Sequence, residues 1–364
     1  MYRSENQYLT TTQISLYTIW ANVRPNMAKR ITIKDVAAQA GVSYQTVSKV
    51  INRRARVSPE TEARIQTIAR SLGYTPHHTA RNLRAQRTWM IGYSWVPARS
   101  GQVNSVLDEF LTSMVEEAEA AGYHLLPFPY REGDDQVSGY RELIDTGKVD
   151  GFVLSSVNYH DPRVRFLLER QFPFVAFGRS DPELDFPYVD VDGTAGLRLV
   201  TEHLIARGHR CIAALAWPKN SRVGDNRMEG YFTALRAAEL PLDADVIARG
   251  EGSYKFGRIE TERWLAREAD RRPTAVVALN DAMAIGAMHA GQACGLAIGR
   301  DLAVTGFDDS PMAQYLAPPL TSVRQPIRQV GRKCVEILTG LLEGHAPVER
   351  QVLLQPELIV RAST

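Results

Sequence analysis

Residues 31–51 have the sequence ITIKDVAAQAGVSYQTVSKVI, and this stretch determines the fold of the N-terminal part of the chain. Thr32, with an acidic residue three positions later, is suited to cap a helix over residues 33–40. Gly41 predicts the end of that helix and a tight turn. A second helix is then expected over residues 44–51. Two short helices joined by a glycine-containing turn are typical of a helix-turn-helix.

The outer face of the second predicted helix carries residues suited to reading bases. When its apolar residues point inward, Tyr44, Gln45, Ser48 and Lys49 remain outside. The Gln45 amide can form two hydrogen bonds with adenine, and Lys49 can donate to guanine. The alternative is that these side chains simply face solvent, but an exposed tyrosine on so short a helix is then unexplained.

A third helix is expected over residues 59–72, with Ser58 as its cap and Gly73 as its stop.

Charge is distributed unevenly along the chain. The surrounding residues 28–87 hold twelve Lys or Arg and three acidic residues, a net charge of +9, whereas residues 88–364 carry −8. A solvated basic face without a partner is the alternative. So strong a bias favours nucleic acid as the partner.

The amino-acid composition is that of a folded protein with two or three domains. The chain has 364 residues, of which 44% are hydrophobic and 23% charged. The three cysteines Cys211, Cys294 and Cys334 lie far apart, which indicates neither a disulfide scaffold nor a structural metal. We therefore expect no metal and no cofactor. No apolar run approaches the roughly 20 residues of a membrane helix.

The first 27 residues form a separate extension in this interpretation. They contain few charges and lack the basic start and small-residue cleavage site of a signal peptide. Within this extension over 1–27, we expect residues 1–26 either to precede the natural start of translation at Met27 or to form a disordered arm.

From residue 89 onward, short apolar runs alternate with amphipathic stretches. This alternation predicts parallel sheets covered by helices on both faces, and the length favours two such doubly wound lobes. Ligands in such folds bind at the carboxyl ends of the strands, here between the lobes. The expected strands are 90–96, 123–128, 151–155, 173–177, 211–217, 246–250, 274–279 and 302–306, and the expected helices are 105–121, 136–145, 162–170, 194–206, 226–238, 257–268, 281–294 and 328–343.

An α/β enzyme is the competing class, and catalytic motifs give it little support. The first strand is followed by Trp95-Val96-Pro97-Ala98 rather than a GxGxxG turn, and neither a Walker loop nor a GxSxG elbow occurs. We therefore expect no catalytic residues and no enzyme activity.

Several segments of the basic module resemble the DNA-binding headpiece of the LacI/GalR family of bacterial transcriptional repressors. They are residues 32–37, 40–48, 57–58 and 72–76. At one position this chain has Lys49 where the family often has Arg, which changes a forked donor into a point donor. The resemblance implies the following DNA-contacting residues: Thr32, Tyr44, Gln45, Thr46, Ser48, Lys49, Asn52, Arg56 and Leu83.

The segment after the headpiece is polar and basic, with Leu83 as its one large apolar residue. Alone, it cannot bury enough surface to fold, so a plain linker is one interpretation. The family resemblance implies instead a hinge helix over residues 77–88. This helix would order on operator DNA and insert Leu83 into the minor groove as a wedge.

The resemblance continues through the body as far as about Arg361, where the chain is similar to the family's effector domain with its periplasmic sugar-binding-protein fold. The matching signatures are 191–193, 208–210, 227–231, 280–286, 306–309 and 318–323. Carried over position by position, the effector-binding residues would be Arg227, Asp308, Asn280, Tyr254, Arg179 and Ser155.

The effector-binding set has the chemistry of a sugar site. Carboxylate, guanidinium and amide groups bind hydroxyls, and Tyr254 would stack on the C–H face of a ring. Three alternatives remain open at this point: Asn280 and Asp308 can serve as helix caps, and Arg179 can pair with Asp181 at the surface.

The sequence as a whole predicts a cytoplasmic, homodimeric transcriptional regulator, most simply a repressor, that binds operator DNA and is controlled by a small molecule. A carbohydrate is the favoured effector, and a purine or a phosphorylated carrier protein is the alternative. A dimer is favoured because the family's tetramer-forming leucine tail does not follow residues 357–361.

The expected fold class is a small all-α headpiece joined to an α/β body of two doubly wound parallel-sheet lobes. The headpiece is expected over residues 28–76, the hinge over 77–88 and the effector-binding and dimerisation domain over 89–364. Within that domain, lobe 1 is expected at about 89–190 and 323–347, and lobe 2 at about 191–322 and 348–364.

Overall fold

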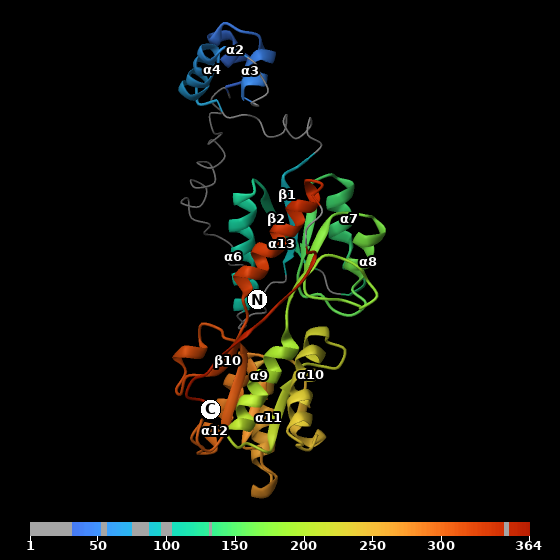
Figure 1. Cartoon of the computed structure of the whole chain (residues 1–364), viewed down its shortest axis with the longest axis vertical. Helices are drawn as coiled ribbons and strands as arrows, with labels where there is room; N and C mark the ends of the chain where they lie inside the picture. Colours follow the sequence, from blue (N-terminus) through green and yellow to red (C-terminus); the bar gives the residue numbers. More distant parts are fainter. Residues whose placement is uncertain (1–30, 52–56, 75–86, 96–103, 131–132, 346–348) are drawn as a thin grey trace, which may run out of the picture. The chain divides into compact units, whose positions relative to one another are not determined.

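The computed structural model describes residues 31–51, 57–74, 87–95, 104–130, 133–345 and 349–364 (Figure 1). It divides into two compact units, Met1–Gln86 and Arg87–Thr364, each of which is described by itself. Among the described residues, no helix is both long and apolar enough to cross a membrane. The expected residues Asn52, Arg56 and Leu83, the extension 1–27 and most of the hinge lie outside the described residues.

The first unit contains the three expected helices, α2 (Ile33–Ala40), α3 (Tyr44–Ile51) and α4 (Pro59–Ser71). The Asp35 carboxylate accepts a hydrogen bond from the Thr32 backbone N–H at 2.7 Å, which secures the start of α2. Gly41 ends that helix with φ of 66°, a left-handed conformation that favours glycine. The helices enclose a small apolar core of Val36, Ala37, Ala40, Val47, Val50 and Ile65.

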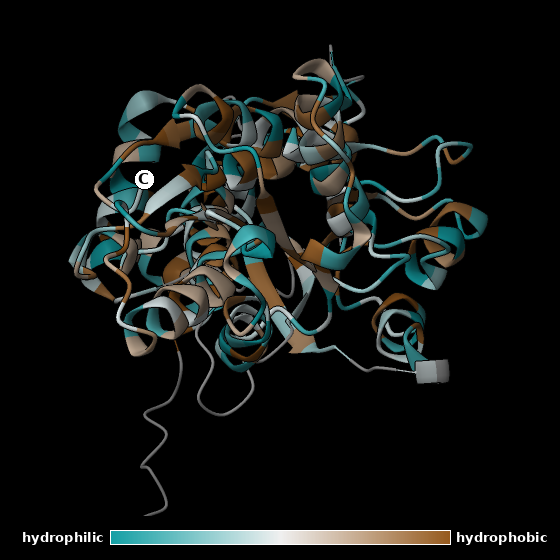
Figure 2. Cartoon of the chain, turned by 90° about the horizontal axis from the view of Figure 1, so that it is seen from below, coloured by the Kyte–Doolittle hydropathy of each residue, from teal (hydrophilic) through white to brown (hydrophobic). Residues whose placement is uncertain are grey.

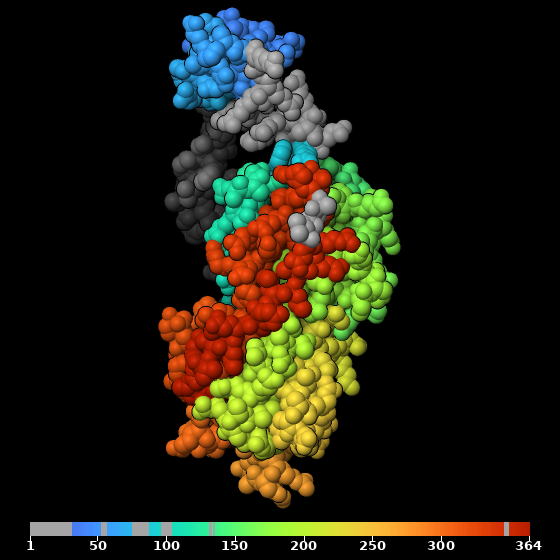
Figure 3. All heavy atoms as spheres, in the orientation of Figure 1, coloured from blue at the N-terminus to red at the C-terminus, as the bar shows by residue number. Residues whose placement is uncertain are grey.

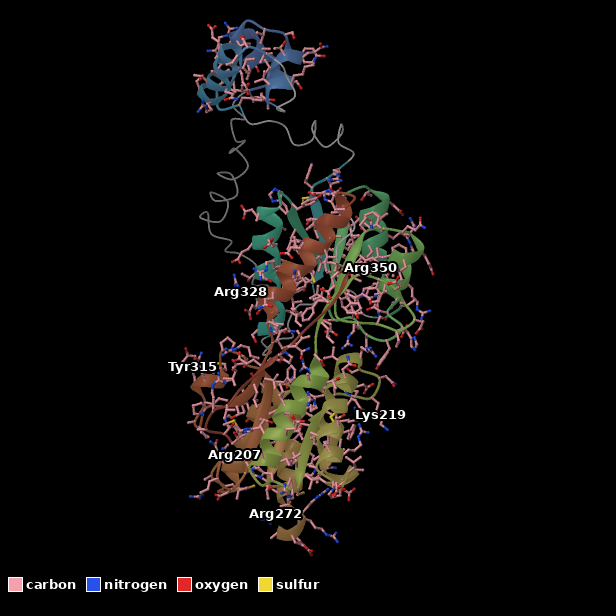
Figure 4. The ribbon with its side chains drawn as sticks, in the orientation of Figure 1. Arg207, Lys219, Arg272, Tyr315, Arg328 and Arg350 are labelled. Carbon is pink, nitrogen blue, oxygen red and sulfur yellow. The ribbon has the colours of Figure 1, made fainter. Side chains whose placement is uncertain are left out.

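The first sheet of the second unit is entirely parallel, with strand order β11-β5-β4-β3-β1-β2. One apolar cluster packs α6 and α13 against one face of this sheet, and a second cluster packs α7 and α8 against the other. The Arg328 side chain of α13 pairs with Glu116 of α6 (Figure 4). The element bounds are β1 Met90–Trp95, α6 Ser105–Ala120, β2 His124–Pro129, α7 Ser138–Asp145, β3 Gly151–Leu154, α8 Pro162–Glu169, β4 Phe174–Phe177, β5 Tyr188–Val191, α13 Ile327–Leu342 and β11 Gln351–Leu354.

The second sheet has the order β12-β10-β9-β8-β6-β7, and it is parallel except for the antiparallel pair β10 and β12. Helices α9 and α10 pack together, as do α11 and α12, around one large apolar core. The apolar strands run through the interior, and the outer helix faces are more polar (Figure 2). The element bounds are α9 Gly193–Ala206, β6 Ile212–Ala216, α10 Arg222–Ala237, β7 Ile247–Arg249, α11 Tyr254–Leu265, β8 Ala275–Ala278, α12 Asp281–Ala293, β9 Ala303–Asp308, β10 Thr321–Arg324 and β12 Glu357–Ile359.

The chain crosses between the two sheets three times, after β5, after β10 and after β11. The last crossing is the red C-terminal segment that runs over both lobes in Figure 3. The expected assignment of 348–364 wholly to lobe 2 is therefore wrong, because β11 pairs in parallel with β5 of the first sheet. The expected boundary between the lobes at residue 323 is wrong as well, because it falls inside β10. The whole of β10 lies in the second sheet, where it pairs with β9.

Close packing of α9 against α10 depends on Gly230. A Cβ atom added there would lie 2.1 Å from the Thr194 carbonyl oxygen, so backbone would have to move. We expect Gly230→Ala to lower the free energy of unfolding by about 3 kcal/mol, measured by chemical denaturation. Gly340→Ala in α13 is the matched control, because the nearest atom to its added Cβ outside the helix's own backbone would be the His345 carbonyl oxygen, at 3.8 Å. A Gly230→Ala protein as stable as this control would contradict the packing argument.

Candidate functional site

The exposed face of α3 carries the residues expected to contact DNA. Tyr44 is 49% exposed, and Gln45 and Lys49 are also exposed. Thr46 and Ser48 are half-buried, and the Thr46 backbone N–H donates to Ser43 Oγ at 3.1 Å at the start of the helix. Thr32, at the start of α2, is exposed but its hydroxyl donates to Asp35 at 2.6 Å. The structure thus places Tyr44, Gln45 and Lys49 where a partner can reach them.

In the second unit, a buried ionic cluster lies at the carboxyl end of the second sheet. Arg227 of α10 is 4% exposed, and its Nη2 lies 3.6 Å from Asp308 Oδ1 at the end of β9. The Arg227 Nη1 donates to the Leu279 carbonyl. The Arg227 Cζ lies 3.5 Å from the ring centre of Phe307 and 5.0 Å from that of Trp217. The sequence therefore brings Arg227 and Asp308 together with two aromatic rings.

Asp308 is held in a strained and half-buried position. Its φ of 107° is unusual for a residue other than glycine, and such strain is concentrated at functional sites. Burial raises the pKa of Asp308 to about 7, although the Arg227 charge acts in the opposite direction. The Gln325 amide donates to Asp308 Oδ1 at 2.8 Å. This glutamine lies between β10 and α13, so a crossing segment contacts the cluster directly.

Asn280 has a structural role in the site. Its Oδ1 accepts from the Met283 backbone N–H at 2.9 Å and caps α12, as its alternative interpretation expects. Its Nδ2 donates to the Gly252 carbonyl at 2.9 Å. The neighbouring Asp281 accepts from the Ser322 hydroxyl and the Ser310 backbone N–H, both at 2.6 Å, and burial raises the pKa of Asp281 to about 6. These bonds fix the loops around Asp308.

The first lobe contributes a second ion pair. Arg179, which follows β4, donates from Nε to Asp190 Oδ2 of β5 at 2.7 Å and not to Asp181. Burial raises the pKa of Asp190, while the charges of Arg179 and Arg227 lower it. The Arg227 of the second lobe therefore acts on a carboxyl group of the first. Ser155 is buried, and its hydroxyl lies 3.1 Å from the Tyr93 hydroxyl.

The two lobes also touch beside this cluster. The Arg222 backbone N–H, at the start of α10, donates to Asn158 Oδ1 at 2.7 Å. The Arg222 guanidinium carbon lies 5.2 Å from the ring centre of Tyr159. Because Asn158 and Tyr159 follow β3, the carboxyl edges of both sheets meet here.

Tyr254 is the first residue of α11 and is 38% exposed. Its hydroxyl lies 2.9 Å from His289 Nδ1 of α12. Trp217 is a second aromatic residue near the cluster, and the sequence analysis did not single it out. Its ring centre lies 5.0 Å from the Arg227 guanidinium carbon, and its sequence signal is its position directly after the apolar strand β6.

Arg179 pairs with Asp190 and Arg227 with Asp308, and the charges of Asp281 and Arg222 lie nearby. In the described part of the chain, no group of three or more His, Cys, Asp or Glu side chains could hold a metal ion. The paired acids and bases are suited to binding a polar molecule through hydrogen bonds.

Comparison with known proteins defines the family. Residues 32–77 match the model described as "Bacterial regulatory proteins, lacI family", and residues 201–364 match a periplasmic binding protein-like domain. The HTH-type transcriptional regulator CelR of Thermobifida fusca is 34% identical over 92% of this chain and 98% of its own length. The chain belongs to the LacI family. It is accordingly a DNA-binding transcriptional regulator with a helix-turn-helix headpiece.

Solved structures of LacI-family proteins share this fold, which confirms the expected fold class. A regulatory protein from Chloroflexus aggregans is 58% identical with a TM-score of 0.74, and the match covers 76% of this chain and 98% of that one. A CelR–cellobiose complex is 31% identical with a TM-score of 0.70, covering 92% and 100%. The Lac repressor dimer bound to operator and the anti-inducer ONPF is 28% identical with a TM-score of 0.80, covering 92% and 99%.

Proposed function

We propose that this LacI-family regulator senses a neutral carbohydrate held between its two lobes, and that the carbohydrate changes its affinity for an operator. The observation that carries the proposal is the strained Asp308 beside Arg227, whose guanidinium packs on the half-buried Trp217. A carboxylate and a guanidinium bind paired hydroxyls, and aromatic rings cover the apolar C–H face of a sugar.

The ion pairs of the site favour a carbohydrate over a phosphorylated effector. Arg179 and Arg227 already face carboxylates, which would compete with a phosphate for these cations. The complex of the similar CelR with cellobiose supports a carbohydrate over a purine. We assign Arg227, Asp308, Arg179, Ser155 and Tyr254 to the ligand side of the site, with Asn280 as a residue that positions its loops.

The protein's partners follow from the same interpretation. We infer that it binds operator DNA as a homodimer in the cytoplasm and catalyses no reaction. The match to the Lac repressor dimer on its operator supports the dimer. The proposed DNA-contacting residues are Thr32, Tyr44, Gln45, Thr46, Ser48, Lys49, Asn52, Arg56 and Leu83.

Gln45 provides a direct test of base recognition. Because its exposed amide can make two hydrogen bonds to one base, we expect Gln45→Ala to weaken operator binding by roughly 10- to 100-fold, with little change on random DNA. Fluorescence anisotropy with both duplexes measures the two affinities. Gln66→Ala is the control, because Gln66 is an exposed amide on α4 that bonds to Glu62. An equal loss on both duplexes would assign Gln45 to phosphate contact instead.

The function itself is tested by a thermal-shift screen of the full-length protein against a panel of mono- and disaccharides. A ligand that binds the folded state raises the unfolding midpoint. Each hit is then added to a gel-shift assay on the protein's own promoter region, where we expect the bound fraction to change. If no carbohydrate shifts the midpoint, or if hits leave operator binding unchanged, the proposed function is wrong.

A further inference from the structure

A single carboxylate holds the start of the second unit. Asp150, directly before β3, accepts at Oδ1 from the Thr88 backbone N–H at 2.7 Å and from the Thr88 hydroxyl at 2.9 Å. Its Oδ2 accepts from the Trp89 backbone N–H at 2.7 Å. Hydrogen bonds to a charged acceptor are stronger than bonds between neutral groups. Asp150 therefore fixes the two residues that precede β1 to the first sheet.

Trp89 has a strained backbone conformation at this point. Its φ of 60° lies in the left-handed region, which is unusual for a bulky residue. Its ring packs on that of Tyr123, with 5.2 Å between the ring centres. The Trp89 carbonyl accepts from the His124 backbone N–H of β2 at 2.9 Å. Strained residues persist only where the surrounding contacts hold them, so the chain is firmly fixed where β1 begins.

Arg87 makes a different attachment, to the end of helix α13. Its Nη2 donates to the carbonyl of Leu342, the last residue of that helix. A cation at the carboxyl terminus of a helix satisfies free carbonyls and is stabilised by the helix dipole. The chain that arrives from the headpiece therefore meets two attachment points in succession: first α13, through Arg87, and then the sheet, through Asp150.

The other end of α13 begins at the ligand cluster. Gln325, two residues before the helix, donates to Asp308 Oδ1, and the neighbouring Arg324 pairs with Asp309 at 2.7 Å between Nη2 and Oδ2. Helix α13 has 16 residues, which corresponds to a length of about 24 Å. One helix therefore begins beside Asp308 and ends at Arg87.

Helix α13 is packed as a rigid element. Its buried face belongs to the apolar cluster of the first sheet, and a Cβ atom added at Gly331 would overlap Ser113 of α6. Packed helices respond to ligands by shifting as units, typically by about 1–2 Å. Such a shift is enough to break the bond between Arg87 and Leu342, whereas the bonds to Asp150 stay with the sheet.

We propose that Arg87 and Asp150 together form an anchor that sets how the chain leaves the body toward the headpiece. Asp150 is its fixed point, and Arg87 follows the position of α13. This inference rests on the proposed function, because it names the residues through which a carbohydrate at Asp308 changes operator affinity. Both are positioning residues outside the ligand site.

Hydrogen exchange of the full-length protein, without sugar or DNA, tests the fixed point alone. We expect the Thr88 and Trp89 amides to exchange at least tenfold faster in Asp150→Asn than in the wild type, because the asparagine NH2 group cannot accept a hydrogen bond. Glu142→Gln is the control, since it changes an exposed carboxylate that pairs with Lys148. Equal exchange in Asp150→Asn and the wild type would overturn the anchor, whatever a sugar screen shows.

The link to α13 is tested by operator affinity with and without sugar. The probes are a labelled duplex of the protein's own promoter region and the sugar of the panel that gives the largest shift of the unfolding midpoint. The ratio of the two affinities measures the coupling between the sites. We expect Arg87→Met to lower this ratio at least threefold, while the sugar affinity of the free protein stays within twofold of the wild type.

Lys333→Met is the matched control, because it removes an exposed cation of α13 that pairs with Glu336, and it is expected to keep the wild-type ratio. Circular dichroism shows whether each variant is folded. If Asp150→Asn does not fold, Thr88→Val removes only the hydroxyl bond to Asp150 and is expected to lower the coupling ratio as well.

The outcomes separate the anchor from the proposed function. If Arg87→Met weakens operator binding equally with and without sugar, Arg87 contacts phosphate, and the inference is wrong while the proposed function stands. An unchanged operator affinity in both conditions would overturn the inference in the same way. If no sugar changes operator binding by the wild type, the proposed function and the role of α13 fail together.

Discussion

Replacing Arg227 with methionine is expected to weaken ligand binding by at least 100-fold. The buried guanidinium lies 3.6 Å from Asp308 and packs on Phe307 and Trp217, so a ligand bound there meets it directly. Each hydrogen bond to a charged group contributes about 1.5–3 kcal/mol, and 1.4 kcal/mol is a factor of ten in affinity. Titration with the best carbohydrate of the screen measures the loss.

The same substitution is expected to lower thermal stability more at pH 8 than at pH 6. Without Arg227, the carboxyl groups of Asp308 and Asp190 lose a nearby positive charge. At pH 6 the Asp308 carboxyl can stay protonated, whereas at pH 8 it is a half-buried anion that has lost its cationic partner. Arg236→Met is the control, because Arg236 lies exposed on the same helix and pairs with Glu229. Equal destabilisation at both pH values would contradict this electrostatic account.

The second large effect is a pH-dependent stability difference between the wild type and Asp308→Asn. The pKa of Asp308 rises from 3.8 to about 7 on folding, so the folded state holds a proton that the unfolded state releases between these values. The contribution of Asp308 to stability is therefore present below pH 4 and is lost as the pH rises to 7. The loss amounts to at most about 4 kcal/mol, from 1.36 kcal/mol per pKa unit.

Asparagine cannot ionise, so Asp308→Asn removes this pH dependence. We expect the variant to gain stability relative to the wild type as the pH rises from 5 to 8, while its ligand affinity falls. Urea denaturation at several pH values gives the difference, in which the other titrating groups, including Asp281, largely cancel. A stability difference that is constant with pH would show that Asp308 is already ionised at pH 5 in the folded protein.

Local signals account for the parts of the fold that the sequence predicts well. Caps and glycines predict α2 and α3 to the residue and α4 to within one residue, because hydrogen bonds at helix ends are made with neighbours in the chain. The alternation of strands and helices in the body is also predicted, but α10 and α11 begin earlier than expected, at Arg222 and Tyr254 after the caps Ser221 and Ser253. Short strands such as β5, β11 and β12 gave no comparable signal. With three or four residues each, they are defined by the strands beside them.

Some residues of the candidate site were also predicted from sequence motifs, whereas others were not. Motif positions identified Arg227 and Asp308, which the fold brings together at the end of the second sheet. Position alone did not predict that the Tyr254 hydroxyl lies beside His289, because this contact depends on the packing of α11 against α12. Trp217 and Gln325 were not expected near the cluster, since their contacts with Arg227 and Asp308 form only when the elements that carry them pack together.

The sequence by itself determined the basic headpiece, the acidic body and the chemical character of the ligand residues, because charge and helix caps are properties of short segments. Only the tertiary structure decided which carboxylate faces which arginine, which aromatic ring covers the pair and how three crossings join the lobes. Burial and pairing depend on contacts between distant segments, and these contacts exist only in the folded chain.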